Sequence, residues 1–211
     1  MAAAVAAGQR VVCVTATRGE LGSTDPQRWP AGAALAEVRT KEMAASMAEL
    51  GVTEHIWLDY PDGGCAEIDD EEAVARLRTI IDDVQPHTLL CFGPDGATYH
   101  PDHMATSRWA SAAVDGTGVR VLHQTNPPAW QEKMDSVVDR SMVMMEDRDP
   151  VTVAPEDCLV YLQLEGEALE QKFRALMCQE SQIGPLIALG GPEMFKQMIS
   201  EEAFSARRDL V

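Results

Sequence analysis

The sequence predicts an α/β fold in which a Rossmann-like parallel sheet carries helices on both faces. Short apolar runs alternate with helical patterns along the chain, and within each run the apolar residues are continuous rather than alternating between two faces. Continuous apolar runs are typical of strands that a parallel sheet buries on both sides. Since 211 residues suffice for one domain with a substantial core but are short for two, we expect residues 1–211 to form a single domain.

The first half of the chain follows a regular order of helices and strands. We expect a strand at Arg10–Thr15 after an alanine-rich helical segment at residues 1–7. A long loop then reaches Gly32 and precedes a helix at Leu35–Leu50, whose methionines and leucine form one buried stripe. A second strand at Glu54–Leu58 follows this helix.

The most regular pattern lies in the middle of the chain. Acidic residues open a helix at Asp69–Val84, where apolar residues recur at helical spacing, and Thr88–Phe92 forms the next apolar run. A further helix is expected to end at Val114, and a strand is expected at Val119–His123. The remaining expected elements are helices at Met134–Met145, Glu167–Glu180 and Glu193–Arg207, with a loop at Asp147–Pro155.

Composition and charge exclude several classes of function. With 34 acidic against 17 basic residues and a net charge of −17, the chain would repel phosphate backbones, so no nucleic-acid partner is expected. No apolar stretch reaches the roughly 18 residues that a membrane-spanning helix needs. The five cysteines form no CxxC pair and two of them fall in apolar runs, which favours reduced thiols and a cytoplasmic location. The first seven residues lack the basic residues of a signal peptide.

Two histidines and an aspartate lie close together in the segment His100-Pro101-Asp102-His103. The segment follows the strand Thr88–Phe92, and open α/β sheets bind their ligands at the carboxyl ends of strands. Since Pro101 suits the first position of a helix, His103 should lie in the first helical turn and His100 just before it. A neutral imidazole can hold zinc, and a second imidazole nearby can hold or deliver a proton. A zinc site needs three or four ligands, so this spacing alone does not establish one.

Polar residues also follow the two earlier strands. Thr17–Gly22 combines glycines that permit a turn with hydroxyl and carboxyl groups, and Asp62 lies in a Pro-Asp-Gly turn after the second strand. On the helix between them, Arg39 and Glu42 share a face and can pair or bind an anion, although isolated charges of this kind are more often solvated surface residues. No Gly-x-Gly-x-x-Gly or Walker loop follows a strand, which argues against a nucleotide-binding module.

Four segments together make the chain resemble the PIG-L (LmbE-like) family of zinc-dependent de-N-acetylases: Thr17–Gly22, Arg39–Glu42, Tyr60–Gly63 and His100–His103. That family includes the deacetylases of N-acetylglucosaminyl-phosphatidylinositol, of mycothiol and of bacillithiol. The resemblance implies a hydrolase that uses zinc to remove the N-acetyl group from an N-acetylglucosamine-type sugar conjugate. It implies a small-molecule partner and leaves the oligomeric state open.

The resemblance also implies roles for individual residues. His103 matches a zinc ligand of the family, and His100 and Asp102 match the catalytic part of the same motif. The histidine in the position of His100 is expected to protonate the leaving amine or to stabilise the oxyanion. Arg39 and Asp62 match positions that contact the sugar.

One motif of the family is missing. The Ala-His-Pro-Asp-Asp-Glu motif, which supplies two zinc ligands and the aspartate that activates water, occurs nowhere in these 211 residues, and Gln179 stands where the family has a histidine. We therefore expect that the chain is truncated at its N-terminus and lacks the central first strand, which would part Val11–Thr15 from Thr88–Phe92. The alternative is a non-catalytic relative that binds a sugar or a partner without the metal.

Overall fold

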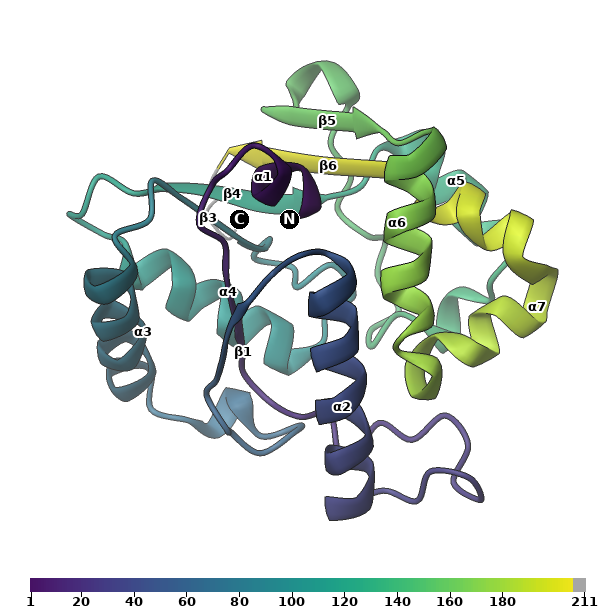
Figure 1. Cartoon of the computed structure of the whole chain (residues 1–211), viewed down its shortest axis with the longest axis horizontal. Helices are drawn as coiled ribbons and strands as arrows, with labels where there is room; N and C mark the ends of the chain where they lie inside the picture. Colours follow the sequence, from purple (N-terminus) through teal and green to yellow (C-terminus); the bar gives the residue numbers. More distant parts are fainter. Residues whose placement is uncertain (207–211) are drawn as a thin grey trace. The chain divides into compact units, whose positions relative to one another are not determined.

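The computed structural model describes residues 1–206, which divide into two compact units. The first unit comprises residues 1–63 and 164–200, and the second comprises residues 64–163 together with the strand that begins at Glu201 (Figure 1). The helices and strands confirm the predicted α/β class, whereas a single domain over residues 1–211 stays a prediction. Within residues 1–206, none of the helices combines the length and the apolar character that crossing a bilayer requires.

The first unit contains a two-stranded parallel sheet, with Val12 opposite Glu54 at one end and Thr15 opposite Trp57 at the other. Helix α6 packs against both α2 and α7. Gly51, with φ 73°, follows α2 in the left-handed conformation that commonly ends a helix. The elements of this unit are α1 (Ala2–Ala6), β1 (Val12–Thr15), α2 (Ala33–Glu49), β2 (Glu54–Trp57), α6 (Gly166–Met177) and α7 (Glu180–Ile199).

The second unit is built on a four-stranded mixed sheet with the strand order β3-β4-β6-β5. Strand β3 pairs parallel with β4, while β6 pairs antiparallel with both β4 and β5. Its strands are β3 (Thr88–Phe92), β4 (Arg120–Thr125), β5 (Val160–Gln163) and β6 (Glu201–Ala206). Its helices are the α-helices α3 (Asp70–Val84), α4 (Pro101–Ala113) and α5 (Pro128–Asp135) and the short 3-10 helices η1 (Cys65–Glu67), η2 (Arg140–Met142) and η3 (Pro155–Asp157).

A hydrophobic core forms where α3 and α4 meet the sheet of the second unit. Ile81 from α3, Ala113 and Val114 from the end of α4, and Val121 from β4 are all buried in one cluster. The start of α3 is fixed by Asp69, whose side chain accepts a hydrogen bond from Glu72 N at 3.0 Å. These contacts hold α4 against β3 and β4, and therefore fix the position at which α4 begins.

Strands β1 and β3 belong to different sheets. Within residues 1–206, β1 pairs with β2 alone and β3 pairs with β4 alone, so each is an edge strand. Both edges carry an exposed apolar side chain, since Val14 is 37% exposed and Leu90 is 49% exposed.

Two of the predicted helices are wrong in their extent. Instead of a helix at Met134–Met145, α5 ends at Asp135, because the Ser136 hydroxyl donates to Lys133 O at 2.7 Å and competes with helical hydrogen bonding. Instead of a helix at Glu193–Arg207, α7 ends at Ile199 and β6 follows; Arg207 lies outside the described residues. Pairing with β4 and β5 on its two sides overrides the helical preference of this glutamate- and alanine-rich segment.

Asp70 joins α3 to α4 and provides a test of this packing. Its carboxylate accepts two hydrogen bonds from Arg108 at 2.8 Å and one from Trp109 Nε1 at 2.6 Å, and the bonds from Arg108 lower the pKa of Asp70. A carboxyl whose pKa is lowered by folding stabilises the protein above its unfolded pKa of about 3.9, and this stabilisation is lost as the pH falls through the folded value.

We expect Asp70→Asn to lower the free energy of unfolding at pH 7, and the difference from wild type to shrink as the pH falls below about 4. Urea unfolding at a series of pH values measures this difference. Glu71→Gln, in the same first turn of α3, controls for the loss of a negative charge near the helix N-terminus. A difference that stays constant from pH 7 to pH 3 would contradict the assignment.

Candidate functional site

The turn between β3 and α4 has an unusual backbone. Gly96, Ala97 and Tyr99 all have positive φ angles, of 60°, 64° and 57°. Glycine adopts this conformation freely, but each non-glycine residue in it costs about 1–3 kcal/mol, and such residues concentrate at functional sites. The turn ends at His100, the N-cap of α4, and Pro101 occupies the first helical position as predicted.

A backbone hydrogen bond sets the tautomer of His100. Its Nδ1 accepts a hydrogen bond from Asp102 N at 3.2 Å, so Nδ1 carries the lone pair. In a neutral imidazole the other ring nitrogen then carries the proton. His100 is therefore held as an Nε2–H donor at the start of α4.

His103 is held in the opposite tautomer. Its Nδ1 lies 3.0 Å from Gly96 O, and because a carbonyl oxygen can only accept, Nδ1 carries the proton. The lone pair of the neutral ring is then on Nε2. A histidine that ligates a metal through Nε2 commonly donates its other ring N–H to a carbonyl in this way. The hydrogen bond to Gly96 thus prepares His103 as an acceptor or a ligand.

The rings of the turn are stacked on one another. The His103 ring lies flat against Phe92, with centroids 4.1 Å apart and an interplanar angle of 5°, and the His100 ring lies 4.8 Å from His103. Asp102, which is 5% exposed, accepts a hydrogen bond from Cys65 N at 3.0 Å and ties η1 to α4. The structure therefore brings together the three predicted residues His100, Asp102 and His103.

The cofactor that the resemblance implies is zinc. A zinc site in a protein needs at least three protein ligands. His103 has the right tautomer for one of them, but within residues 1–206 no three His, Cys, Asp or Glu side chains gather in a group that could hold a metal ion. The described residues alone do not fit a zinc site.

The other two predicted site residues, Arg39 and Asp62, lie in the first unit, where both hold the loop after β1. Arg39 is 9% exposed and donates to the carbonyl oxygens of Gly19 and Gly22, the latter at 2.6 Å. Asp62 accepts from Leu21 N at 2.8 Å and from Thr17 Oγ1 at 3.3 Å. The side chains that the family resemblance assigns to sugar contact thus also give the loop its shape.

Buried polar atoms without partners lie in the same loop region. Within residues 1–206, neither Nε of Arg39 nor Oε2 of Glu20 has a hydrogen-bond partner, although both atoms are buried. The other oxygen of Glu20 accepts from Asp62 N at 3.0 Å. Burial lowers the pKa of Arg39, and the nearby charges of Asp62, Glu42 and Glu20 oppose this shift. Unpartnered buried groups are costly, so this region has unused capacity for hydrogen bonds to a polar ligand.

Glu42 connects this loop region to α7. Its carboxylate accepts hydrogen bonds from both the backbone N–H of Ser181, at 2.7 Å, and the Ser181 hydroxyl, at 2.6 Å. Ser181 is fully buried, and its carbonyl oxygen accepts from Thr24 Oγ1 at 2.7 Å. Glu42 is therefore a structural partner rather than a solvated surface charge, a role that its helical spacing to Arg39 did not indicate.

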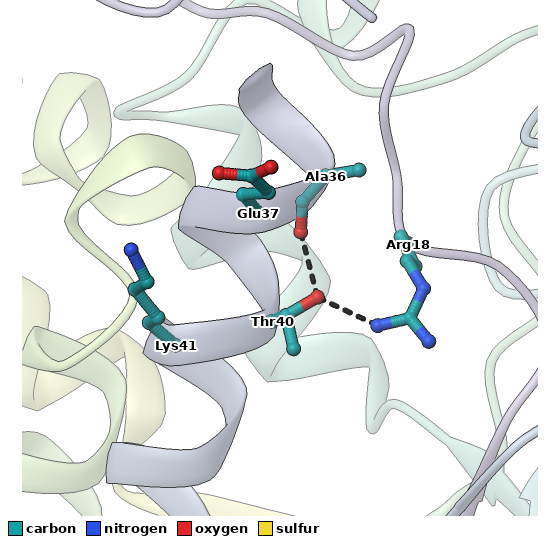
Figure 2. Close-up of a pocket in the computed structure, with 5 residues that line it drawn as sticks. All are labelled: Arg18, Ala36, Glu37, Thr40 and Lys41. Carbon is teal, nitrogen blue, oxygen red and sulfur yellow. Dashed lines mark hydrogen bonds between the residues drawn. The ribbon is translucent and has the colours of Figure 1, made fainter. Parts of the chain in front are cut away.

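A depression of about 340 Å³ lies on α2 in the first unit (Figure 2). Arg18 lines it from a neighbouring segment: its Nη1 donates to Thr40 Oγ1 at 2.7 Å, and that hydroxyl donates in turn to Ala36 O. Glu37 and Lys41 complete the lining. None of the five predicted site residues lines this depression, so it does not enlarge the candidate site.

The sequence drew attention to the histidines but not to the residues that orient them. Gly96 and Phe92 set the ring of His103, and Tyr99 carries a strained backbone directly before His100. A sequence signal exists only for Gly96, which lies in an Asp-Gly turn. The tautomers of His100 and His103 have no sequence signal, because they depend on distances between the histidine rings and backbone atoms.

Comparisons with known proteins point to one family. Residues 1–114 match the family described as PIG-L, GlcNAc-PI de-N-acetylase. A 1D-myo-inositol 2-acetamido-2-deoxy-alpha-D-glucopyranoside deacetylase from Acidothermus cellulolyticus is 32% identical over 222 residues, which cover 90% of this chain and 76% of the relative. The protein of the same name from Kineococcus radiotolerans is 35% identical over 131 residues, covering 49% of this chain and 36% of the relative. The match therefore spans little more than a third of that second relative.

Solved structures share the fold. The zinc-inhibited form of teicoplanin deacetylase Orf2 superimposes with a TM-score of 0.64 over 99% of this chain and 92% of that chain. The two sequences are 18% identical, so this likeness establishes the fold alone.

Gly96→Ala tests the placement of His103. A Cβ atom at position 96 would lie 2.8 Å from His103 Cβ and 3.0 Å from Met104 N, in addition to the strain of a positive φ. We expect a loss of stability of more than about 1 kcal/mol, measured by urea unfolding. Gly116→Ala is the matched control, because Gly116 has φ 81° but no atom within 4 Å of the added Cβ. Equal losses in the two variants would contradict the close approach at Gly96.

Arg39→Lys tests whether Arg39 shapes the loop after β1. One ammonium group cannot replace the two guanidinium nitrogens that reach Gly19 O and Gly22 O, so we expect a loss of about 1.5–3 kcal/mol in the free energy of unfolding. Arg10→Lys, at an exposed pair with Glu54, should cost less than about 1 kcal/mol. If the variant at position 39 unfolds like wild type, Arg39 does not hold the loop.

Proposed function

Because the chain belongs to the PIG-L family of GlcNAc-PI de-N-acetylases, we propose that it removes the N-acetyl group from a small-molecule sugar conjugate of the N-acetylglucosamine type by hydrolysis. The observation that carries this proposal is the pair of opposite tautomers in the histidine turn. One imidazole is prepared to give a proton and the other to offer a lone pair, which is the combination that amide hydrolysis requires.

The proposed chemistry assigns the proton of the leaving amine to His100. Hydrolysis forms a bond between the water oxygen and the acetyl carbonyl carbon, and breaks the bond between that carbon and the sugar nitrogen. The water loses one proton in this step, and the lone pair on Nε2 of His103 is proposed to accept it. The departing nitrogen needs a proton, and the tautomer of His100 carries one on Nε2. Asp102 keeps its predicted catalytic role as a proposal, and its contact with Cys65 N supports a role in holding the turn.

The sugar is proposed to interact with Asp62 and Arg39 in the first unit. Both side chains are fixed by the loop after β1, which lowers the entropy that binding would cost. The buried Nε of Arg39 and Oε2 of Glu20 support binding of a group with both donors and acceptors, which a sugar hydroxyl provides.

No step of this proposal involves zinc. The family resemblance implies zinc, and His103 is the one predicted ligand whose tautomer suits it, but the donor set within residues 1–206 is incomplete. We also propose a cytoplasmic location, which the free thiols of the five cysteines support.

The incomplete donor set favours one second candidate. In a non-catalytic relative, the loop held by Arg39 and Asp62 would bind the sugar without hydrolysis. The two candidates predict the same ligand but differ in whether a free amine appears, so one experiment separates them.

We expect the full chain, incubated with 1D-myo-inositol 2-acetamido-2-deoxy-α-D-glucopyranoside, to release a primary amine that a fluorogenic amine reagent detects. His100→Ala should lower the rate by about 100-fold or more, because general acid catalysis typically contributes that much. His87→Ala, which alters an exposed histidine outside the site, should leave the rate unchanged.

The outcomes separate the candidates. A rise in melting temperature with this conjugate but no amine would overturn hydrolysis and support the binding relative. Neither a melting shift nor an amine would overturn both.

A further inference from the structure

The backbone before His100 must be held in place by its surroundings. Tyr99 has a φ of 57°, a conformation that a bulky side chain rarely adopts, and Ala97 two residues earlier is also left-handed. Such a conformation persists only where other contacts over-determine it. The contacts that hold Tyr99 are therefore candidates for controlling His100, the next residue.

The segment Arg140–Asp149, which we term the strap, supplies those contacts within the second unit. The Tyr99 hydroxyl donates to Asp149 O at 2.8 Å, and the guanidinium of Arg148 lies 4.4 Å from the centroid of the Tyr99 ring. Met145 N donates to Thr98 O at 2.9 Å. Tyr99 is 5% exposed, so both its ring and its hydroxyl are enclosed by these contacts.

Arg140 fixes the strap to the end of α5. Its Nη1 donates to Asp149 Oδ1 at 2.6 Å, and its Nη2 donates to Asp135 Oδ2 at 2.6 Å. Asp149 thus carries both the carbonyl that accepts from Tyr99 and the carboxylate that Arg140 holds. Exposed ion pairs of this kind add little stability, so any importance of Arg140 must lie in the geometry that it imposes.

We infer that Arg140 and Tyr99 are positioning residues, which act through the strap to hold the His100 imidazole in its Nε2–H orientation. The direction of the His100 side chain follows from the dihedral angles of the turn, and its ring must meet Asp102 N on one side while stacking on His103. If Asp149 moves, Tyr99 loses its acceptor and the turn is free to relax. The inference rests on the proposed function in one respect only, which is that the His100 proton passes to the leaving amine.

The test is a long-range ¹H–¹⁵N spectrum of the full chain with ¹⁵N-labelled histidine at a fixed pH above neutrality, where the tautomer of each ring is read directly. His100→Gln and His103→Gln assign the signals. In wild type we expect a single Nε2–H pattern for His100. In Arg140→Ala we expect this pattern to be lost to a mixture of both tautomers, while His103, which Gly96 O holds, keeps its own pattern.

Arg174→Ala is the matched control. Arg174 also bridges two carboxylates, of Glu49 and Glu167, and its side chain is 46% exposed against 40% for Arg140. It should leave the His100 pattern unchanged. A merely structural role for Arg140 would lower the melting temperature without changing the tautomer.

Tyr99→Phe keeps the test decisive if Arg140→Ala does not fold. It retains the ring beneath Arg148 and removes only the hydrogen bond to Asp149 O. We expect the same loss of the single His100 pattern. An unchanged pattern in either folded variant, or a wild-type His100 that is not Nε2–H, would overturn the inference. Because the spectrum requires no substrate, its result is independent of whether amine release is observed.

Discussion

The hydrogen bond between the His103 imidazole and the carbonyl of Gly96 is the constraint on which the candidate site depends. It needs a left-handed residue at position 96, and the space beside His103 Cβ leaves no room there for a side chain. It sets the protonated nitrogen of His103 and orients the ring that stacks against Phe92. The His100 ring stacks on the His103 ring, and His100 is the N-cap of α4. The chemistry of the turn thus follows from backbone geometry more than from the exposure of its side chains.

The loop after β1 shows a related principle in the first unit. The family resemblance gives Arg39 and Asp62 roles in sugar contact, and in the structure both side chains hold the backbone of that loop. Rigid elements that fix a loop through buried charged groups prepare it for a ligand, since little ordering then remains to be done on binding. Two buried atoms that have no hydrogen-bond partner among residues 1–206, Nε of Arg39 and Oε2 of Glu20, belong to this same region.

Sequence reasoning recovered the elements whose signals are local. Helix α3 has an N-cap aspartate, an acidic first turn and an apolar stripe, and α4 begins at Pro101, so both were placed to within a residue or two. Strands β5 and β6 were missed, because their pairing joins segments about forty residues apart in the chain and is decided by tertiary contacts. The proximity of His100, Asp102 and His103 was predictable from their spacing. The tautomers of the two histidines and the contacts between Tyr99 and the strap depend on the positions of backbone atoms, which carry no sequence signal.

The histidine turn presents His103 as one prepared ligand, while residues 1–206 do not complete a zinc site. Competition for Zn²⁺ between the purified full chain and a chromophoric chelator, in wild type and in His103→Gln, measures this most directly. We expect wild type to yield its zinc to the chelator and His103→Gln to bind zinc still more weakly. Retention of one equivalent of zinc against the chelator, unaffected by His103→Gln, would contradict it.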